Sequence, residues 1–270
     1  GEYAIVAFNK KSKKLFLSID PYAVKPLYFS FNRNSLSFSS EISSCIRNLK
    51  GINHNPPEID IDSLGEYLLF RCFSGRNTGY KNIYKLKPGE VLIIDQISGN
   101  IEFENCKSKD IEILKNFENN LTKNRFLELI NFYTQSDVPI SLCLSGGLDS
   151  TMVYYALKEL NYNPLAFNVK QSENDPDYGS CLAIKNDSSQ LKLNVIDISK
   201  VKIWNPRNFQ NISQIFNGWI HLPNAFFLYE LFKEATKYSK VILSGEGSDE
   251  ILRGYNRYGS LNQVIDDKYF

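Results

Sequence analysis

Short apolar stretches separated by polar turns run through the first part of the chain. Residues 3–8 and 15–19 flank a lysine-rich segment, and residues 27–31 and 35–38 flank an Asn-Arg-Asn triplet. Each pair predicts a β-hairpin. Residues 61–70 have helical spacing after an acidic start, which predicts a helix. The first part is therefore predicted to be β-rich.

From about residue 138 the pattern changes, and short apolar runs alternate with stretches of helical spacing. The predicted strands are residues 139–144, 164–169, 194–198 and 240–244, and the predicted helices are residues 121–133, 150–160, 178–191 and 224–239. Strands that alternate with helices indicate βαβ units, in which a parallel sheet is covered on both faces.

These patterns predict an α/β chain of two domains. Residues 1–95 form a β-rich domain, residues 96–120 are polar with little periodicity and are taken as a linker, and residues 121–270 form a doubly wound parallel-sheet domain. The first residue is Gly1, and residues 2–8 are typical of a strand already in progress, so we expect the chain to begin inside a domain.

Composition narrows the classes of function. The 270 residues include 31 basic and 30 acidic ones, and a net charge of +1 gives no reason to expect a nucleic acid or an anionic membrane as partner. No apolar run reaches the roughly 18 residues that a membrane span needs. The five cysteines are scattered and odd in number, which argues against a disulfide framework or a zinc site and favours a reducing cytoplasm.

The loop SGGLDS, residues 145–150, stands where a predicted strand ends and a helix begins. Adjacent glycines let the backbone approach a ligand, and the amides of a helix N-terminus attract anions. No lysine lies inside the loop, so it suits phosphate or pyrophosphate rather than the γ-phosphoryl cradle of a Walker A motif. Asp149 is unexpected beside phosphates unless Mg²⁺ bridges them. An ordinary glycine-containing turn is the competing interpretation.

A second glycine-rich loop, SGEGSDE at residues 244–250, follows the last predicted strand. Its carboxylates Glu246, Asp249 and Glu250 would repel one another unless a metal, a cationic group or a shared proton relieves them. A solvated acidic turn is the competing interpretation. Two such loops in this order are more specific than either alone, and their spacing suits neighbouring strands of a doubly wound sheet, where ligands bind at the carboxyl ends.

These motifs resemble a known family. The segment from Ser136 through the SGGLDS loop resembles the start of the synthetase domain of asparagine synthetases, and residues 244–250 resemble its second signature. Residues 20–29 and 38–41 resemble the later half of a class II glutamine amidotransferase domain. Residues 96–120 are covered least well. The resemblance implies a partial glutaminase-type domain followed by an ATP-pyrophosphatase domain of the adenine nucleotide alpha hydrolase-like type.

The resemblance also implies a reaction. ATP activates the carboxylate of aspartate as an acyl-adenylate with release of pyrophosphate, and ammonia supplied from glutamine displaces AMP to form asparagine. Asp149 and Asp249 would bind Mg²⁺, and Val169 would lie beside adenine. Glu246 and Asp249 would be catalytic, with Glu246 managing the charge and protons of ammonia. The implied nucleotide-binding residues are Ser145, Gly146, Gly147, Asp149, Ser150, Val169, Ser244 and Gly245.

Three departures from the family pattern bear on this assignment. The family's glutaminase nucleophile is a cysteine immediately after the initiator Met, whereas Gly1 matches a glycine in the middle of that domain, so the chain is expected to be a fragment. A late lysine and other substrate residues are expected beyond Phe270. Arg253 stands where the family usually has glycine.

Two other interpretations stay open. The same adenylation with another carboxylate is typical of β-lactam synthetases, lasso-peptide cyclases and sugar-modifying amidotransferases, and a non-catalytic remnant is the third alternative. The expected partners are small molecules, namely aspartate or another carboxylate and ammonia from glutamine, with no nucleic acid and no membrane. A homodimer is one option for the assembly.

Two motifs near the loops are assigned structural roles. Asp175-Pro176-Asp177 is interpreted as a turn before a helix rather than as a loop near the nucleotide. The Phe-Phe-Leu run at residues 226–228 has helical spacing and is predicted to lie in the core.

Overall fold

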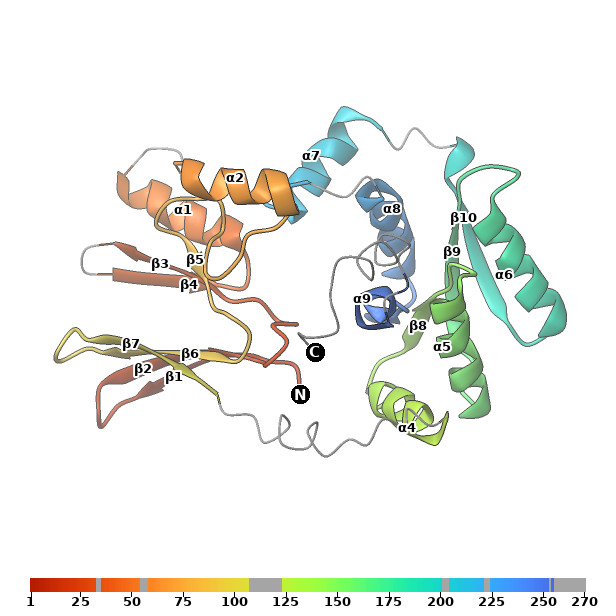
Figure 1. Cartoon of the computed structure of the whole chain (residues 1–270), viewed down its shortest axis with the longest axis horizontal. Coiled ribbons are helices and arrows are strands. Elements are labelled where there is room, and N and C mark those ends of the chain that lie inside the picture. Colours follow the sequence, from red (N-terminus) through yellow and green to blue (C-terminus); the bar gives the residue numbers. More distant parts are fainter. Residues whose placement is uncertain are drawn as a thin grey trace, which may run out of the picture. The chain divides into compact units, whose positions relative to one another are not determined.

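The computed structural model describes residues 1–32, 35–53, 58–106, 123–200, 204–220, 224–252 and 254. Their contacts group into two compact units. The first unit is Gly1–Glu118 with Phe216–His221, and the second is Asn119–Ile215 with Leu222–Phe270. Figure 1 labels the helices and strands of both units.

The first unit is built on two antiparallel sheets, with strand orders β1-β2-β6-β7 and β4-β3-β5. The strands are β1 (Ala4–Asn9), β2 (Lys14–Ile19), β3 (Tyr28–Asn32), β4 (Ser35–Ser39), β5 (Tyr84–Lys85), β6 (Glu90–Asp95) and β7 (Ile101–Asn105). Both predicted hairpins are confirmed, because β1 pairs with β2 and β3 pairs with β4.

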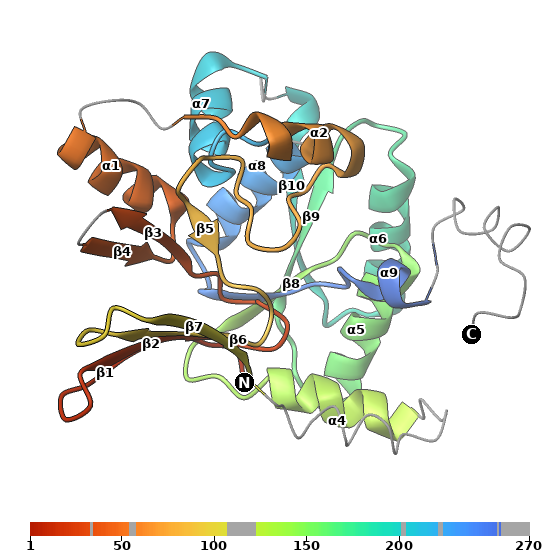
Figure 2. The ribbon, with the colours of Figure 1, turned by 60° about the vertical axis from the view of Figure 1, so that its left-hand side comes forward.

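Buried side chains from both sheets form the core of this unit, namely Leu17, Ile19, Leu27, Phe29, Leu86 and Leu92. Two helices, α1 (Ile42–Asn53) and α2 (Ile61–Phe70), belong to the same unit. Ile42 and Cys45 of α1 pack against Ile83, and α1 covers β3 and β4. Figures 1 and 2 show the layers: the β1-β2-β6-β7 sheet, then β3 and β4, then α1.

Strand β7 lies inside the stretch predicted as a linker, residues 96–120. It pairs with β6 in antiparallel register, with Leu92 opposite Phe103, and all of its side chains are exposed. An exposed edge strand needs no continuous apolar face, so the hydrophobic pattern did not reveal it. Residues 107–122 lie outside the described residues.

The second unit is built on a parallel sheet with the order β10-β9-β8-β11. Its strands are β8 (Ile140–Cys143), β9 (Leu165–Lys170), β10 (Lys192–Asp197) and β11 (Val241–Leu243). The chain builds the sheet outward from β8 to β10 and then returns to place β11 on the other side of β8. The order therefore reverses between β8 and β11, and such a switch point opens a crevice at the carboxyl ends of the strands.

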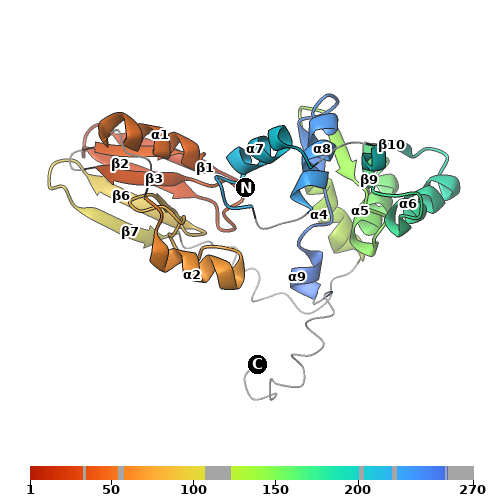
Figure 3. The same ribbon diagram turned by 90° about the horizontal axis from the view of Figure 1, so that it is seen from above.

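Helices cover both faces of this sheet. On one face lie α5 (Leu148–Glu159) and α6 (Pro176–Asp187), with α4 (Lys123–Tyr133) packed on α5, and on the other lies α8 (Ala225–Ala235). Figure 3 shows α8 on one side of β9, and α5 and α6 on the other. The predicted α/β fold class, a β-rich part followed by a doubly wound parallel sheet, is confirmed.

The remaining helical elements of the described chain are η1 (Ile198–Lys200), α7 (Pro206–Ile215) and α9 (Ser248–Leu252). None of the described helices combines the length and apolarity needed to cross a bilayer. All five cysteines are free thiols.

The loop between β2 and β3 is organised by one carboxylate, Asp20, whose residue is only 1% exposed. Its two oxygens accept hydrogen bonds from the backbone N–H groups of Tyr3, Tyr22, Val24 and Lys25, at 3.0 to 3.4 Å. Burial by itself raises the pKa of Asp20, but these four hydrogen bonds outweigh it and hold the pKa below the ordinary value of 3.8.

We predict that Asp20→Asn lowers the free energy of unfolding at neutral pH by about 2 kcal/mol or more, because each hydrogen bond to a charged group contributes ~1.5–3 kcal/mol. A lowered folded-state pKa gives stability that is present above the unfolded-state pKa and is lost as the pH falls through the folded-state pKa. Urea unfolding should therefore show the gap between wild type and variant narrowing below about pH 3.8. A gap that stays constant on acidification contradicts this role.

Candidate active site

A cavity of about 390 Å³ opens at the carboxyl ends of β8, β9 and β11, inside the second unit. All of the site residues predicted from the sequence line it, with the exception of Gly146. The structure thus brings together two loops that lie about a hundred residues apart in the chain, at the reversal of strand order.

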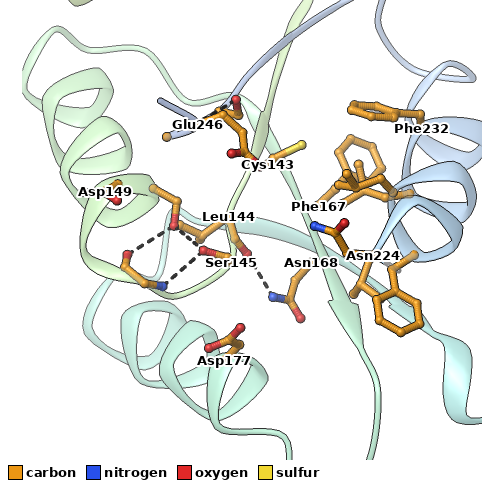
Figure 4. Close-up of a pocket in the computed structure, with 18 of the residues that line it drawn as sticks. Cys143, Leu144, Ser145, Asp149, Phe167, Asn168, Asp177, Asn224, Phe232 and Glu246 are labelled. Carbon is orange, nitrogen blue, oxygen red and sulfur yellow. Dashed lines mark hydrogen bonds between the residues drawn. The ribbon is translucent and has the colours of Figure 1, made fainter. Parts of the chain in front are cut away.

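The hydroxyl groups of the first loop make hydrogen bonds within the loop. Ser145 and Ser150 share a hydrogen bond of 3.0 Å between their Oγ atoms, and Ser145 Oγ also accepts from the N–H of Gly147 at 3.3 Å. Gly147 is the N-cap of α5, so the first amides of that helix stand at the cavity. Figure 4 shows Asp149, Asp177 and Glu246 arranged around Ser145. The amides and hydroxyls suit an anion.

Gly146 does not line the cavity, but the loop depends on it. Its φ is +89°, and a Cβ there would lie 2.8 Å from Ser180 Cβ and closer still to the carbonyl oxygen of Asp177. The loop therefore packs directly on the N-terminal turn of α6. Only glycine combines this backbone conformation with this clearance.

Gly245 likewise lets the second loop pack closely, because it has no side chain. A Cβ at Gly245 would lie 2.7 Å from the backbone N of Ser150 and 2.8 Å from Asp149 Cβ. The second loop is therefore packed against the first turn of α5, with no room for a side chain between them. This contact brings the carboxylates of both loops to one cavity.

Several acidic side chains line the cavity. Asp149, Glu246, Asp249 and Glu250 all line it, and Asp177 joins them from α6. Across the residues that the structure describes, no three His, Cys, Asp or Glu side chains gather closely enough to hold a metal ion by themselves. Any cation here would therefore take part of its ligand shell from a bound phosphate or from water.

Asp175-Pro176-Asp177 has both a structural and a cavity position. Asp175 caps α6, since its Oδ1 accepts from the N–H groups of Asp177 at 3.0 Å and Tyr178 at 3.3 Å. The predicted turn before a helix is confirmed. The same turn also brings Asp177 to the cavity, and that position was missed, although its place after the second strand of the sheet was a usable signal.

Helix α8 supplies an apolar wall, which the pattern of apolar residues did not predict. Asn224 and four side chains of α8 line the cavity, namely Phe227, Leu228, Leu231 and Phe232. The prediction of a core role for residues 226–228 is correct for Phe226, which is 3% exposed, but Phe227 and Leu228 are only half-buried and face the cavity. Helical spacing identifies apolar positions without telling core from cavity wall.

Hydrogen bonds from β9 and α6 hold Leu144, the residue that precedes the first loop. The carbonyl oxygen of Leu144 accepts hydrogen bonds from Asn168 Nδ2 at 2.9 Å and from the thiol of Cys181 at 3.0 Å, and the N–H of Leu144 donates to the carbonyl of Phe167 at 2.9 Å. Burial raises the pKa of Cys181 to about 12, so its thiol stays a donor. Val169, which follows Asn168 in β9, lines the cavity as well.

Cys143 also lines the cavity. Burial, with a smaller contribution from the negative charge of Glu246, raises the pKa of its thiol to about 11. Cys143 is therefore protonated at neutral pH and is not an activated nucleophile.

A cavity at a topological switch point, walled by two glycine-rich loops and helix N-terminal amides, is an arrangement that suits a phosphate-bearing ligand in an α/β domain. Two family models match the chain: Asparagine synthase over residues 125–267 and Glutamine amidotransferase domain over residues 1–103. The chain belongs to the asparagine synthase family, as its motifs suggested.

Individual relatives agree with the family match. "Asparagine synthetase [glutamine-hydrolyzing] 1" of Bacillus subtilis is 30% identical over 96% of this chain and 40% of its own length. "Putative asparagine synthetase [glutamine-hydrolyzing] 2" of Methanocaldococcus jannaschii is 26% identical over 94% of this chain and 50% of its own length. The chain therefore spans half or less of these curated relatives.

Two other comparisons are weaker. "Amidase chry2" of Gibberella zeae is 29% identical over 57% of this chain and 22% of its own length. The solved NH3-dependent NAD synthetase of Campylobacter jejuni is 19% identical, with a TM-score of 0.34 over 49% of this chain and 58% of that one. So weak a structural likeness says nothing about function.

We predict that Gly245→Ala destabilises the second unit by ~1–3 kcal/mol, the usual result of forcing an extra methyl into a packed contact. Gly179→Ala in α6 is the matched control, because a Cβ there meets nothing within 4 Å. Alanine is the better helix former, so the control should be as stable as wild type or more so. Equal unfolding midpoints for the two variants would contradict the packing of the second loop on α5.

We also predict that Glu246→Gln lowers the pKa of Cys143 from its value of about 11, because the variant removes a neighbouring negative charge. Site-resolved iodoacetamide labelling across pH measures this, with Glu159→Gln as control, since Glu159 pairs with Lys123 and does not line the cavity. Identical labelling profiles at Cys143 in the two variants would refute the proximity of Glu246 to the thiol.

Proposed function

We propose that this chain is part of a glutamine-dependent amide ligase that makes asparagine from aspartate. The observation that carries the proposal is the packing of the SGGLDS loop against the SGEGSDE loop at the switch point of the sheet, around one cavity. Family membership supports the same conclusion.

The proposed first step is attack of the aspartate carboxylate on the α-phosphorus of ATP. A bond forms from carboxylate oxygen to phosphorus, the bond to the bridging oxygen breaks, and pyrophosphate leaves with the negative charge. Ser145, Gly146, Gly147 and Ser150 would hold that pyrophosphate through backbone amides and hydroxyls at the start of α5. Preorganised donors of this kind stabilise charge that develops during reaction.

Mg²⁺ fits the carboxylates that line this cavity. Asp149 and Asp249 offer the hard oxygen ligands that Mg²⁺ prefers, and they alone do not complete its usual shell of six. When bound, the ion would supply positive charge to the phosphate oxygens. Without such a charge, several carboxylates and a polyphosphate in one cavity would repel one another.

The proposed second step is attack of ammonia on the acyl carbon, which forms the amide bond and expels AMP. Glu246 is the residue proposed to accept a proton from the attacking nitrogen, with Asp249 as a second catalytic carboxylate. Ser244 and Gly245 would contact the nucleotide or the acyl-adenylate. Val169 would lie beside adenine, and the apolar side chains of α8 suit a flat base on the same side.

The ammonia would come from glutamine, because the first unit corresponds to the amidotransferase match at residues 1–103. We propose residues 1–95 as the later part of that domain, residues 96–120 as the connection, and residues 121–270 as the early part of the synthetase domain. A cytoplasmic location is proposed with it, and the five free thiols are consistent with that.

Release of AMP tests the function directly. The intact protein should form AMP and pyrophosphate from ATP only when aspartate is present, and asparagine when ammonia or glutamine is added. AMP formation with another carboxylate and not with aspartate would support a β-lactam synthetase, cyclase or sugar-modifying type of activity instead. No AMP with any carboxylate would support a non-catalytic remnant.

We predict that Asp149→Ala lowers aspartate-dependent ATP–pyrophosphate exchange on the order of 100-fold or more, as expected when a group that stabilises developing charge is removed. Asp137→Ala is the control, because Asp137 is exposed, precedes β8 and does not line the cavity. Exchange at the native rate in Asp149→Ala would refute the assignment of Asp149 as a metal ligand.

A further inference from the structure

Helix α8 has two faces with different neighbours inside the second unit. On one face, Leu228 and Leu231 line the cavity, and Leu231 also packs against Phe167 of β9. On the other face, Phe226 and Glu230 contact helix α7. Because an α-helix has 3.6 residues per turn, these two sets of side chains lie on opposite sides of α8. Figures 1 and 3 accordingly show α8 between α7 and β9.

The two ends of α8 are supported by different elements. Toward its C-terminal end, Leu231 and Ala235 are buried in the cluster that contains Phe167 of the sheet. The first turn of α8 holds Phe227 and Leu228, which line the cavity, and α7 packs on the opposite side of this part of the helix. The contact with α7 therefore helps to set where the beginning of the apolar wall stands.

Part of the contact between α7 and α8 is apolar. The ring of Phe226, a residue that is 3% exposed, lies 4.1 Å from the ring of Trp204 and 6.3 Å from that of Phe209, measured between centroids. Ile212 of α7 is also buried. Apolar packing stabilises such a contact but is not directional, so by itself it leaves the rotation of one helix against the other weakly specified.

Two hydrogen bonds between side chains supply the direction that apolar packing lacks. Asn208 Nδ2 donates to Glu230 Oε1 at 3.0 Å, and Asn211 Nδ2 donates to Tyr229 Oη at 2.9 Å. Asn208 is 8% exposed and the side chain of Glu230 is 11% exposed, with Lys233 Nζ donating to the other carboxylate oxygen at 3.1 Å. A nearly buried carboxylate is costly to leave unpaired, so a rotation of α8 that separates it from Asn208 is disfavoured.

We propose that Asn208 and Glu230 form a positioning pair: their hydrogen bond fixes the rotation of α8 against α7 and so keeps Phe227 and Leu228 at the cavity for the base of a nucleotide. Neither residue of the pair lines the cavity, so both act through α8. The inference rests on the proposed function in taking that nucleotide to be ATP. If separating the pair lowers the fraction of molecules with the wall in place, the apparent affinity for ATP falls by the same factor.

Exchanging the two members of the pair gives the variants that test it. Asn208→Asp places a second carboxylate beside that of Glu230, so repulsion replaces the hydrogen bond. Adding Glu230→Gln restores one donor and one acceptor with their roles exchanged, because the glutamine amide donates to the aspartate. Glu234→Gln is the control, since Glu234 lies on the same helix, pairs with Lys237 and does not line the cavity. Each variant is made in the intact protein.

Three measurements apply to every variant: equilibrium binding of ATP, equilibrium binding of pyrophosphate, and hydrogen exchange over residues 225–230. In Asn208→Asp we expect about tenfold weaker binding of ATP, comparable to the loss of one base stacked on aromatic side chains, and unchanged binding of pyrophosphate, which has no base. Hydrogen exchange should be faster over residues 225–230 and unchanged in α5. In ATP–pyrophosphate exchange, KM for ATP should rise while the rate at saturating ATP is kept. The double variant and Glu234→Gln should behave as wild type.

The outcomes separate this inference from the proposed function. Equal weakening of ATP and pyrophosphate binding in Asn208→Asp would overturn the positioning role, because it would indicate a general loss of packing. Unchanged ATP affinity in Asn208→Asp, or a double variant that does not regain ATP binding, would overturn it as well. A wild-type protein that binds no ATP would refute the proposed function instead. Faster hydrogen exchange in Asn208→Asp that the double variant reverses would then still support the restraint on α8, and equal exchange would overturn it.

Discussion

The second unit depends on one steric constraint, the contact between Gly245 and the first turn of α5. Strands β8 and β11 are neighbours, and their following loops can meet only if the backbone of one touches the backbone of the other. The missing side chain at Gly245 allows this approach to Asp149 and Ser150. The positions of Asp149 and Glu246 in the cavity follow from that contact, because both residues stand next to it in their loops.

The same contact gathers groups with opposite electrostatic preferences in one cavity. Carboxylates from both loops and from α6 share one cavity with the N-terminal amides of α5. The amides favour an anion, whereas the carboxylates oppose one, and each effect is strengthened where water is excluded. The proposed ligand, ATP with a bound cation, would satisfy both sets of groups. The apolar wall of α8 would offer its base a surface that the charged loops cannot.

Much of the architecture could be read from the chain. Buried strands such as β8 and β9 are short apolar runs, and α2 begins at Ile61 and ends at Phe70, where the pattern predicted. The elements that were missed bury little or are mostly polar. β7 is wholly exposed, and α7 exposes Phe209 and Ile215 while burying Ile212. For such elements the decision lies with pairing and packing partners, which local periodicity does not contain.

The sequence by itself indicated the proposed chemistry, because it places glycines, hydroxyls and carboxylates together in two strand-to-helix loops. The resemblance to a family follows from the same short motifs. Tertiary structure alone decided that Phe227 lines the cavity while Phe226 is buried, and that Asp177 joins the carboxylates. It also decided that Trp219 packs among the rings of Tyr67, Phe73 and Tyr80. These assignments depend on which surfaces meet when distant segments fold together, and a pattern along one chain holds no such information.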